Sequence, residues 1–91
     1  MFNKKKTNQN SPIQSQILAA LGVIEDDLGE SVPIEEIAFS LRVDFKNKMN
    51  EAKVAQIILE LEKGGFVKNN EQKYSLLPKG AKIADEYLKT L

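Results

Sequence analysis

The chain of 91 residues contains no cysteine and no histidine, and its only arginine is Arg42. The lack of cysteine excludes disulfides, zinc fingers and thiol catalysis. The lack of histidine removes the side chain most used for acid–base chemistry near neutral pH. A single domain of this size can bury one modest core but has little room for a deep catalytic cleft. We therefore expect a binding module rather than an enzyme, and we expect no metal and no cofactor.

Long apolar runs are also absent from the sequence. No stretch approaches the ~20 apolar residues that a membrane-spanning helix needs. Three lysines near the start, Lys4, Lys5 and Lys6, are not followed by the apolar segment of a signal peptide. The sequence therefore predicts a cytoplasmic protein that does not enter the membrane.

The net charge is zero, but the charges are unevenly distributed along the chain. Residues 11–41 carry six acids and no base, whereas residues 42–79 carry eight bases and five acids. A fold that separates these two segments would have a positive side suited to phosphate groups. The alternative is an acidic, solvated first helix with no functional meaning.

Residues 1–10 are polar and lack periodicity, so the sequence predicts a disordered basic tail before a single domain over 11–91. Lys4–Lys6 would be an electrostatic arm or a solubilising tail. Ser11 and Pro12 predict a helix start, and Gly29 predicts its end. Gly22 indicates either a close contact of this helix with a neighbour or an earlier end. The apolar face of the helix is Ile13, Ile17, Leu21, Ile24 and Leu28.

A short strand at Ser31-Val32 is expected next, followed by a helix that begins around Pro33 with acids in its first turn. Its apolar face is Ile34, Ile37, Ala38 and Leu41. Phe45 and Met49 lie in the polar connection that follows, where they would cap the core or form a partner-binding knob.

A third helix is predicted from the N-cap Asn50 to Lys63-Gly64-Gly65. Its apolar residues recur at helical spacing: Val54, Ile57, Ile58 and Leu61. Phe66-Val67 can then pair with residues 74–76 across the four turn formers 69–72, and Pro78 opens a last helix to about Thr90. We expect one shared core of Ile17, Leu21, Ile37, Leu41, Val54, Ile58, Leu61 and Phe66.

Residues 59–80 read LELEKGGFVKNNEQKYSLLPKG. This string resembles the L-x-x-L-E-x-x-G-[LF]-[VI] and Y-x-L-T-x-x-G patterns of winged helix-turn-helix transcription regulators of the MarR and PadR types. The resemblance covers about residues 13–91 and implies a mainly α fold with a small β-wing, in the order α-β-α-α-β-β-α. One departure is Leu77, which stands where those families place a threonine cap.

The resemblance also implies a use for the third helix, which in such regulators enters the major groove of DNA. The matching outward residues are Lys53 and Gln56, whose side chains can reach guanine or phosphate and adenine respectively. Four further lysines would contact phosphates: Lys46, Lys48, Lys68 and Lys73. The alternative is an ordinary solvated helix face.

The last helix would either complete the core against the first helix or pair with a second copy through Tyr87, Leu88 and Leu91. A homodimer would set two reading helices on palindromic double-stranded DNA. From the resemblance we expect a DNA-binding transcription regulator, in the form of a homodimer that inserts its third helix in the major groove. The alternative is a winged-helix module that binds another protein and no nucleic acid.

Overall fold

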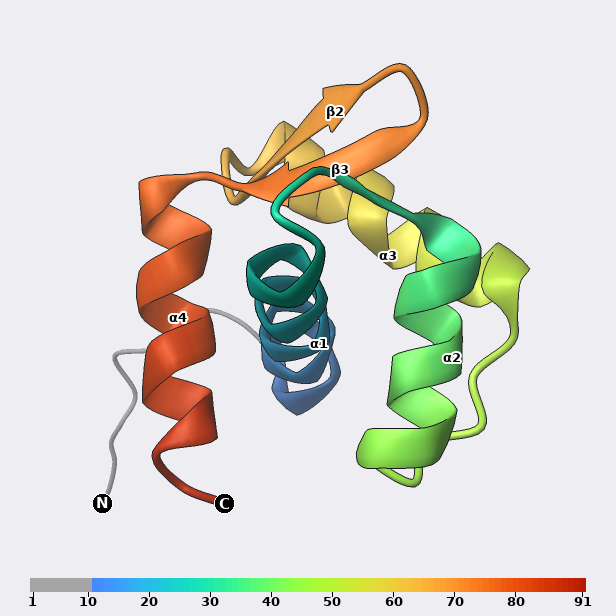
Figure 1. Cartoon of the computed structure of the whole chain (residues 1–91), viewed down its shortest axis with the longest axis vertical. Helices are drawn as coiled ribbons and strands as arrows, with labels where there is room; N and C mark the ends of the chain where they lie inside the picture. Colours follow the sequence, from blue (N-terminus) through green and yellow to red (C-terminus); the bar gives the residue numbers. More distant parts are fainter. Residues whose placement is uncertain (1–10) are drawn as a thin grey trace.

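The computed structural model describes residues 11–91, so the expectations for residues 1–10, including Lys4–Lys6, lie outside the described part of the chain. The elements follow in the order α1 (Pro12–Leu28), β1 (Val32–Pro33), α2 (Ile34–Asp44), α3 (Glu51–Lys63), β2 (Val67–Asn70), β3 (Lys73–Leu76) and α4 (Pro78–Leu88) (Figure 1). The fold is mainly helical with a small antiparallel sheet. Both this composition and the element order agree with the prediction.

The helix α1 begins with the cap that the sequence predicts. Ser11 Oγ accepts from the Gln14 N–H at 3.2 Å, and Gln14 Oε1 accepts from the Ser11 N–H at 3.3 Å, which makes a reciprocal capping box. The helix continues through Gly22 and ends at Gly29, whose φ of 71° is left-handed. A Cβ on Gly22 would lie 3.0 Å from Leu76 Cδ1, so the close-contact alternative is confirmed.

Both ends of α3 are also capped. Asn50 Oδ1 accepts from the Lys53 N–H at 2.8 Å, as predicted. At the other end, Lys79 Nζ donates to the Gly64 carbonyl at 3.0 Å, a favourable place for a cation because helix carbonyls are unpaired there. The start of α4 has no side-chain cap at Leu77, which the sequence indicated.

The sheet has the order β1-β3-β2. The predicted turn over residues 69–72 is shorter in the structure, because Asn69 and Asn70 belong to β2 and only Glu71 and Gln72 connect the strands. These two residues have φ values of 55° and 71°, the geometry of a tight turn that matches strand twist. Asn69 Oδ1 accepts from the Gln72 N–H at 3.0 Å and holds this turn.

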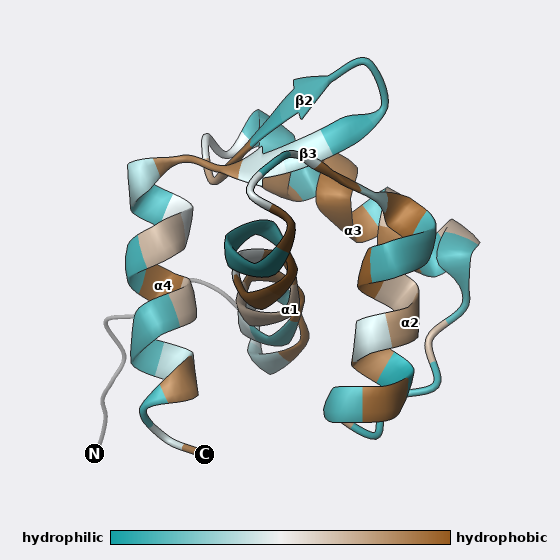
Figure 2. Cartoon of the chain, viewed as in Figure 1, coloured by the Kyte–Doolittle hydropathy of each residue, from teal (hydrophilic) through white to brown (hydrophobic). Residues whose placement is uncertain are grey.

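The core lies around α1, which packs against the other helices and the sheet. Figure 2 shows hydrophobic residues along α1 and the inner sides of α2 and α3, while the hairpin is largely hydrophilic. Of the eight residues predicted to share the core, seven are buried and Phe66 is only partly buried. The neighbouring Val67 is buried instead. Phe45 and Met49 pack against the core, so their role as core caps is confirmed.

The helix α4 packs along α1, with Gly80 and Ala84 buried in the contact. It therefore completes the core within the chain, as one of the two alternatives for this helix predicted. Across residues 11–91 no helix combines the length and the apolar character needed to cross a membrane.

Candidate nucleic-acid interface

The outward face of α3 is a candidate surface because no other element of residues 11–91 covers it. Its buried stripe is Val54, Ile57, Ile58 and Leu61. With 3.6 residues per turn, the centre of the opposite face is Ala52, Gln56, Leu59 and Lys63. Lys53 lies on one flank of this face, near Glu60. Both predicted base-reading residues, Lys53 and Gln56, are exposed, but only Gln56 is central.

The acidic side chain nearest this face in the helix is turned toward another element. Glu60 Oε1 accepts from Gln14 Nε2 at 3.5 Å, which directs the carboxylate toward the first turn of α1. This contact lessens, but does not remove, the repulsion that a phosphate near Lys53 would meet.

The connection between α2 and α3 presents two of the predicted phosphate ligands. Along it, Phe45, Asn47 and Met49 are partly buried, whereas Lys46 and Lys48 are exposed. Partly buried and exposed residues thus alternate along the connection. Both lysines project to the solvent side immediately before α3.

The other two predicted phosphate ligands lie on the β2–β3 hairpin. Lys68 is paired with Ser75 and Asn70 with Lys73, so both lysines are on the same face of the sheet. Tyr74, one residue from Lys73, points to the buried face. The lysines are therefore on the solvent side of the hairpin, which directly follows the C-terminal end of α3.

The sequence interpretation missed two exposed apolar residues at the centres of helix faces. Leu59 on α3 is 51% exposed, and Phe39 on α2 is 54% exposed. The Arg42 guanidinium lies 5.4 Å from the centroid of the Phe39 ring, and Val43 is also exposed. In the sequence, both positions lie off the apolar stripes of their helices. An apolar residue at such a position was the signal that could have identified them. Neither residue contributes to the predicted core.

The three predicted dimerisation residues have different surroundings. Tyr87 is partly buried and accepts a hydrogen bond from Gln16 Nε2 at 3.0 Å. Leu88 is partly buried at the edge of a groove, and Leu91 is 75% exposed. Because Tyr87 is used within the chain, the predicted dimer contact depends mainly on Leu88 and Leu91.

Comparisons with protein-family models, with curated proteins and with solved structures found no match for this chain.

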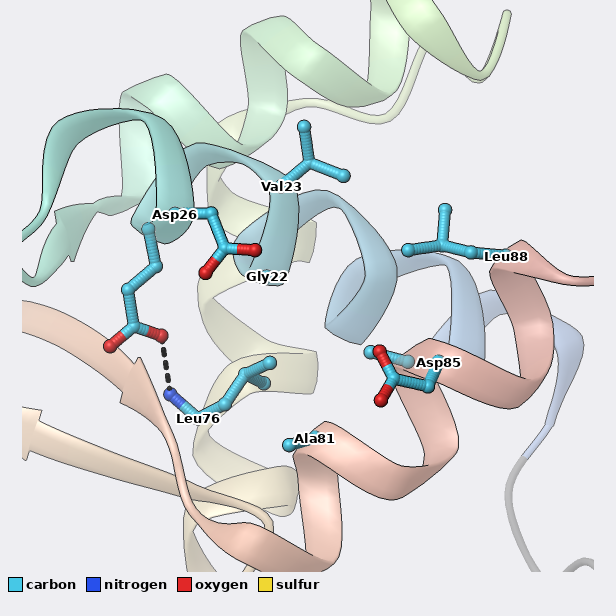
Figure 3. A pocket seen from close by; sticks show the side chains of 9 residues that line it. Gly22, Val23, Asp26, Leu76, Ala81, Asp85 and Leu88 are labelled. Atoms are coloured by element: carbon cyan, nitrogen blue, oxygen red, sulfur yellow. Dashed lines mark hydrogen bonds between the residues drawn. The ribbon is translucent and has the colours of Figure 1, made fainter.

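An acidic groove lies between α1 and α4. It is a groove of about 410 Å³ with Leu76 in its lining, and carboxylates come from both helices: Glu25, Asp26 and Asp85. Glu25 Oε1 accepts from the Leu76 N–H at 3.0 Å, and the dashed line at Leu76 in Figure 3 marks this bond. The carboxylates make this groove an unfavourable place for a phosphate group.

One titratable group on the hairpin is clearly perturbed. Burial of Tyr74, together with the negative charge of Glu62, raises the pKa of its phenol above the usual 10.0. The phenol is therefore neutral at physiological pH and adds no charge to the lysine face. Within residues 11–91 no three acidic side chains are grouped so that they could hold a metal ion.

Proposed function

We propose that the chain is a winged helix-turn-helix protein that binds double-stranded DNA and regulates transcription. In this proposal α3 is the reading helix, and the β2–β3 hairpin is the wing. The single observation that best supports it is the exposure of four lysines in the segments directly before and directly after an uncovered helix: Lys46, Lys48, Lys68 and Lys73. Phosphate contacts on both sides of a helix would fix its register in a groove.

The chemistry of the α3 face is compatible with this use. Gln56 can make two hydrogen bonds to adenine, and Lys53 can reach guanine or a phosphate. Leu59 adds a further possibility that the sequence interpretation lacked, because an apolar side chain can contact the methyl group of thymine. The acidic α1–α4 groove also favours a defined orientation, with the lysine-bearing segments toward the DNA.

A titration with generic duplex DNA at two salt concentrations tests the proposal. Binding that weakens steeply with salt is expected, because each neutralised phosphate releases counterions. The matched variant is Lys68→Ala with Lys73→Ala, which removes charge from exposed hairpin positions and leaves the core intact. Absence of binding by the unaltered chain at low salt would exclude the proposal.

The second candidate is a protein-binding module, and the exposure of Leu59 and Phe39 favours it. Two apolar side chains at the centres of exposed helix faces suit a protein interface better than a phosphate backbone. Only one arginine is present to make the bidentate phosphate contacts that DNA readers often use. In this case the chain would not bind duplex DNA at low salt. The loss of the Phe39 or Leu59 side chain would then weaken binding to a protein partner.

A further inference from the structure

A chain of side-chain contacts connects the end of α4 to the segment that carries Lys46 and Lys48. Asn47 Nδ2 donates to Gln16 Oε1 at 2.8 Å, and Gln16 Nε2 donates to the Tyr87 hydroxyl at 3.0 Å. The Gln16 amide therefore uses both its acceptor and one donor, and it bridges α4 and the connection from its place on α1. The three residues are separated by 31 and 71 positions in sequence.

A ring contact reinforces these hydrogen bonds. The centroids of Phe45 and Tyr87 are 6.3 Å apart with the ring planes tilted by 42°, within the range of favourable aromatic pairs. The side chain of Tyr87 thus reaches the connection in two ways, through its ring to Phe45 and through its hydroxyl to Gln16 and then Asn47. Phe45 and Asn47, the two residues of the connection in these contacts, are both partly buried.

The backbone between these anchors has an unusual conformation. Lys46 has a φ of 57°, a left-handed value that a residue with a Cβ adopts at some cost. The neighbouring Asn47 is held twice, since its N–H donates to the Leu41 carbonyl at 2.8 Å while its side chain donates to Gln16. Such a conformation persists only where surrounding contacts fix it. The anchors on either side of Lys46 supply that constraint.

We propose that Tyr87 is a positioning residue for phosphate binding: through Gln16, Asn47 and Phe45 it holds the connection so that Lys46 and Lys48 project together beside the N-terminal end of α3. This inference rests on the proposed DNA-binding function and extends it to a residue on the opposite side of α1. Phosphate affinity then depends on the state of α4. A partner or second copy that engaged Tyr87 would release the connection and weaken DNA binding. By the same coupling, bound DNA would weaken the binding of that partner by the same factor.

The test compares Tyr87→Phe with a double lysine variant and their combination. Tyr87→Phe keeps the ring beside Phe45 and removes the hydroxyl that accepts from Gln16. The lysine variant is Lys46→Gly with Lys48→Ala, in which glycine tolerates the positive φ. The readouts are affinity for generic duplex DNA across a salt series, and amide hydrogen exchange of the free protein. The stability control is Val32→Ala, which removes buried methyl groups at β1 and leaves α4 and the hydrogen-bonded residues unaltered.

If the inference is correct, the lysine variant lowers the slope of log affinity against log salt by about 1.8, because two phosphate contacts at about 0.9 each are lost. Tyr87→Phe lowers the slope in the same direction and adds little when combined with the lysine variant, since both act on the same contacts. In the free protein it speeds exchange of the Asn47 amide by about tenfold relative to the Gly29 amide. Val32→Ala has no such selective effect.

The remaining outcomes separate the two proposals. If the unaltered chain binds DNA but Tyr87→Phe leaves Asn47 exchange and the salt slope unchanged, the positioning role is wrong and DNA binding stands. An effect of Tyr87→Phe that is fully additive with the lysine variant also contradicts it. If the unaltered chain does not bind DNA at low salt, the proposed function fails and the positioning role fails with it.

Discussion

The α-carbon of Gly80 lies against the backbone carbonyl of Phe66 so closely that a methyl group has no room between them. This contact brings the first turn of α4 onto the residue that precedes β2, and the Leu77 N–H donates to the same Phe66 carbonyl at 3.0 Å. The approach fixes where α4 leaves the sheet and how it packs on α1.

Gly80→Ala is therefore expected to destabilise the fold by about 1–3 kcal/mol, because a backbone carbonyl cannot move aside as a flexible side chain can. Gly22→Ala is the matched control, since it also adds a methyl group inside a helix at the α1–α4 contact. There the new Cβ meets side-chain atoms only, Leu76 Cδ1 at 3.0 Å and Ala84 Cβ at 3.8 Å, and alanine is about 1 kcal/mol better than glycine in a helix. We expect a change near zero at Gly22. Urea denaturation of both variants checks the contrast, and equal losses would contradict it.

Leu61 and Leu59 lie two positions apart on α3 but on opposite faces, with 1% and 51% of their surface exposed. Leu61→Ala should cost about 2–5 kcal/mol, because it removes buried methyl groups and leaves a cavity. Leu59→Ala should cost less than about 0.5 kcal/mol, as is usual at exposed sites. Thermal and urea unfolding measure both. Similar losses at the two positions would mean that the orientation of α3 is wrong.

The raised pKa of Tyr74 predicts a loss of stability in alkaline solution. In the folded chain burial keeps the phenol protonated above pH 10.0, whereas the unfolded chain releases the proton near that value. The folded state then holds more protons, so stability falls as pH rises above 10, by at most about 1.4 kcal/mol per pH unit from this group. Tyr74→Phe removes this contribution while leaving lysine titration in place. Urea denaturation at pH 9 and pH 11 should therefore show a smaller alkaline loss for the variant than for the unaltered chain.

Helix ends and buried stripes were predictable from the sequence because they depend on near neighbours. Ser11, Asn50 and Gly29 act within a few residues of their own position, and the stripe of α3 repeats at helical spacing. The tight turn at Glu71-Gln72 was missed because neither residue is a usual occupant of left-handed positions. There the Asn69 side chain supplies a local hydrogen bond that the composition of the turn does not indicate.

The candidate surface was only partly predictable for a different reason. The exposure of Lys46, Lys48, Lys68 and Lys73 followed from polarity. The contacts that hold the segment carrying the first two lysines join residues far apart in the sequence, such as Gln16 and Tyr87. No local pattern joins Gln16 to Tyr87, so the same tyrosine was interpreted as a surface residue for a second copy. Its place beside Gln16 and Phe45 depends on the packing of α4, and the sequence left two alternatives open for that helix.

Self-association through the end of α4 remains a prediction, and it now depends on Leu88 and Leu91. Leu91 is 75% exposed, and Leu88 lies at the rim of the acidic groove, so both can contact a second copy without disturbing the core. Leu88→Lys with Leu91→Lys should convert a dimer to a monomer in sedimentation equilibrium. Leu28→Lys, at an exposed apolar position of α1, is the control and should leave the dimer intact. An unaltered chain that is monomeric at high micromolar concentration would contradict the homodimer.

If the α3 face and the hairpin bind DNA, their residues should affect different properties of binding. Lys68→Ala or Lys73→Ala, on the solvent face of the hairpin, should weaken binding to every sequence alike. Each should lower the salt slope by about one unit, because each removes one phosphate contact. Lys53→Ala or Gln56→Ala should instead change the preference among sequences, since one good contact to a base edge contributes about 1–3 kcal/mol of discrimination.

A binding selection on randomised duplex DNA, followed by affinities for the best site and a scrambled site at fixed salt, measures both properties. Glu86→Gln, an exposed change on α4, is the control and should alter neither the preference nor the slope by as much as the lysine variants do. Because α3 presents Gln56 and Leu59 at the centre of its outward face, the Gln56 variant should shift preference more than the Lys53 variant, whose side chain lies on the flank. If all four substitutions leave affinity and preference unchanged, this face does not bind DNA. The exposed Leu59 and Phe39 would then be better explained by a protein partner.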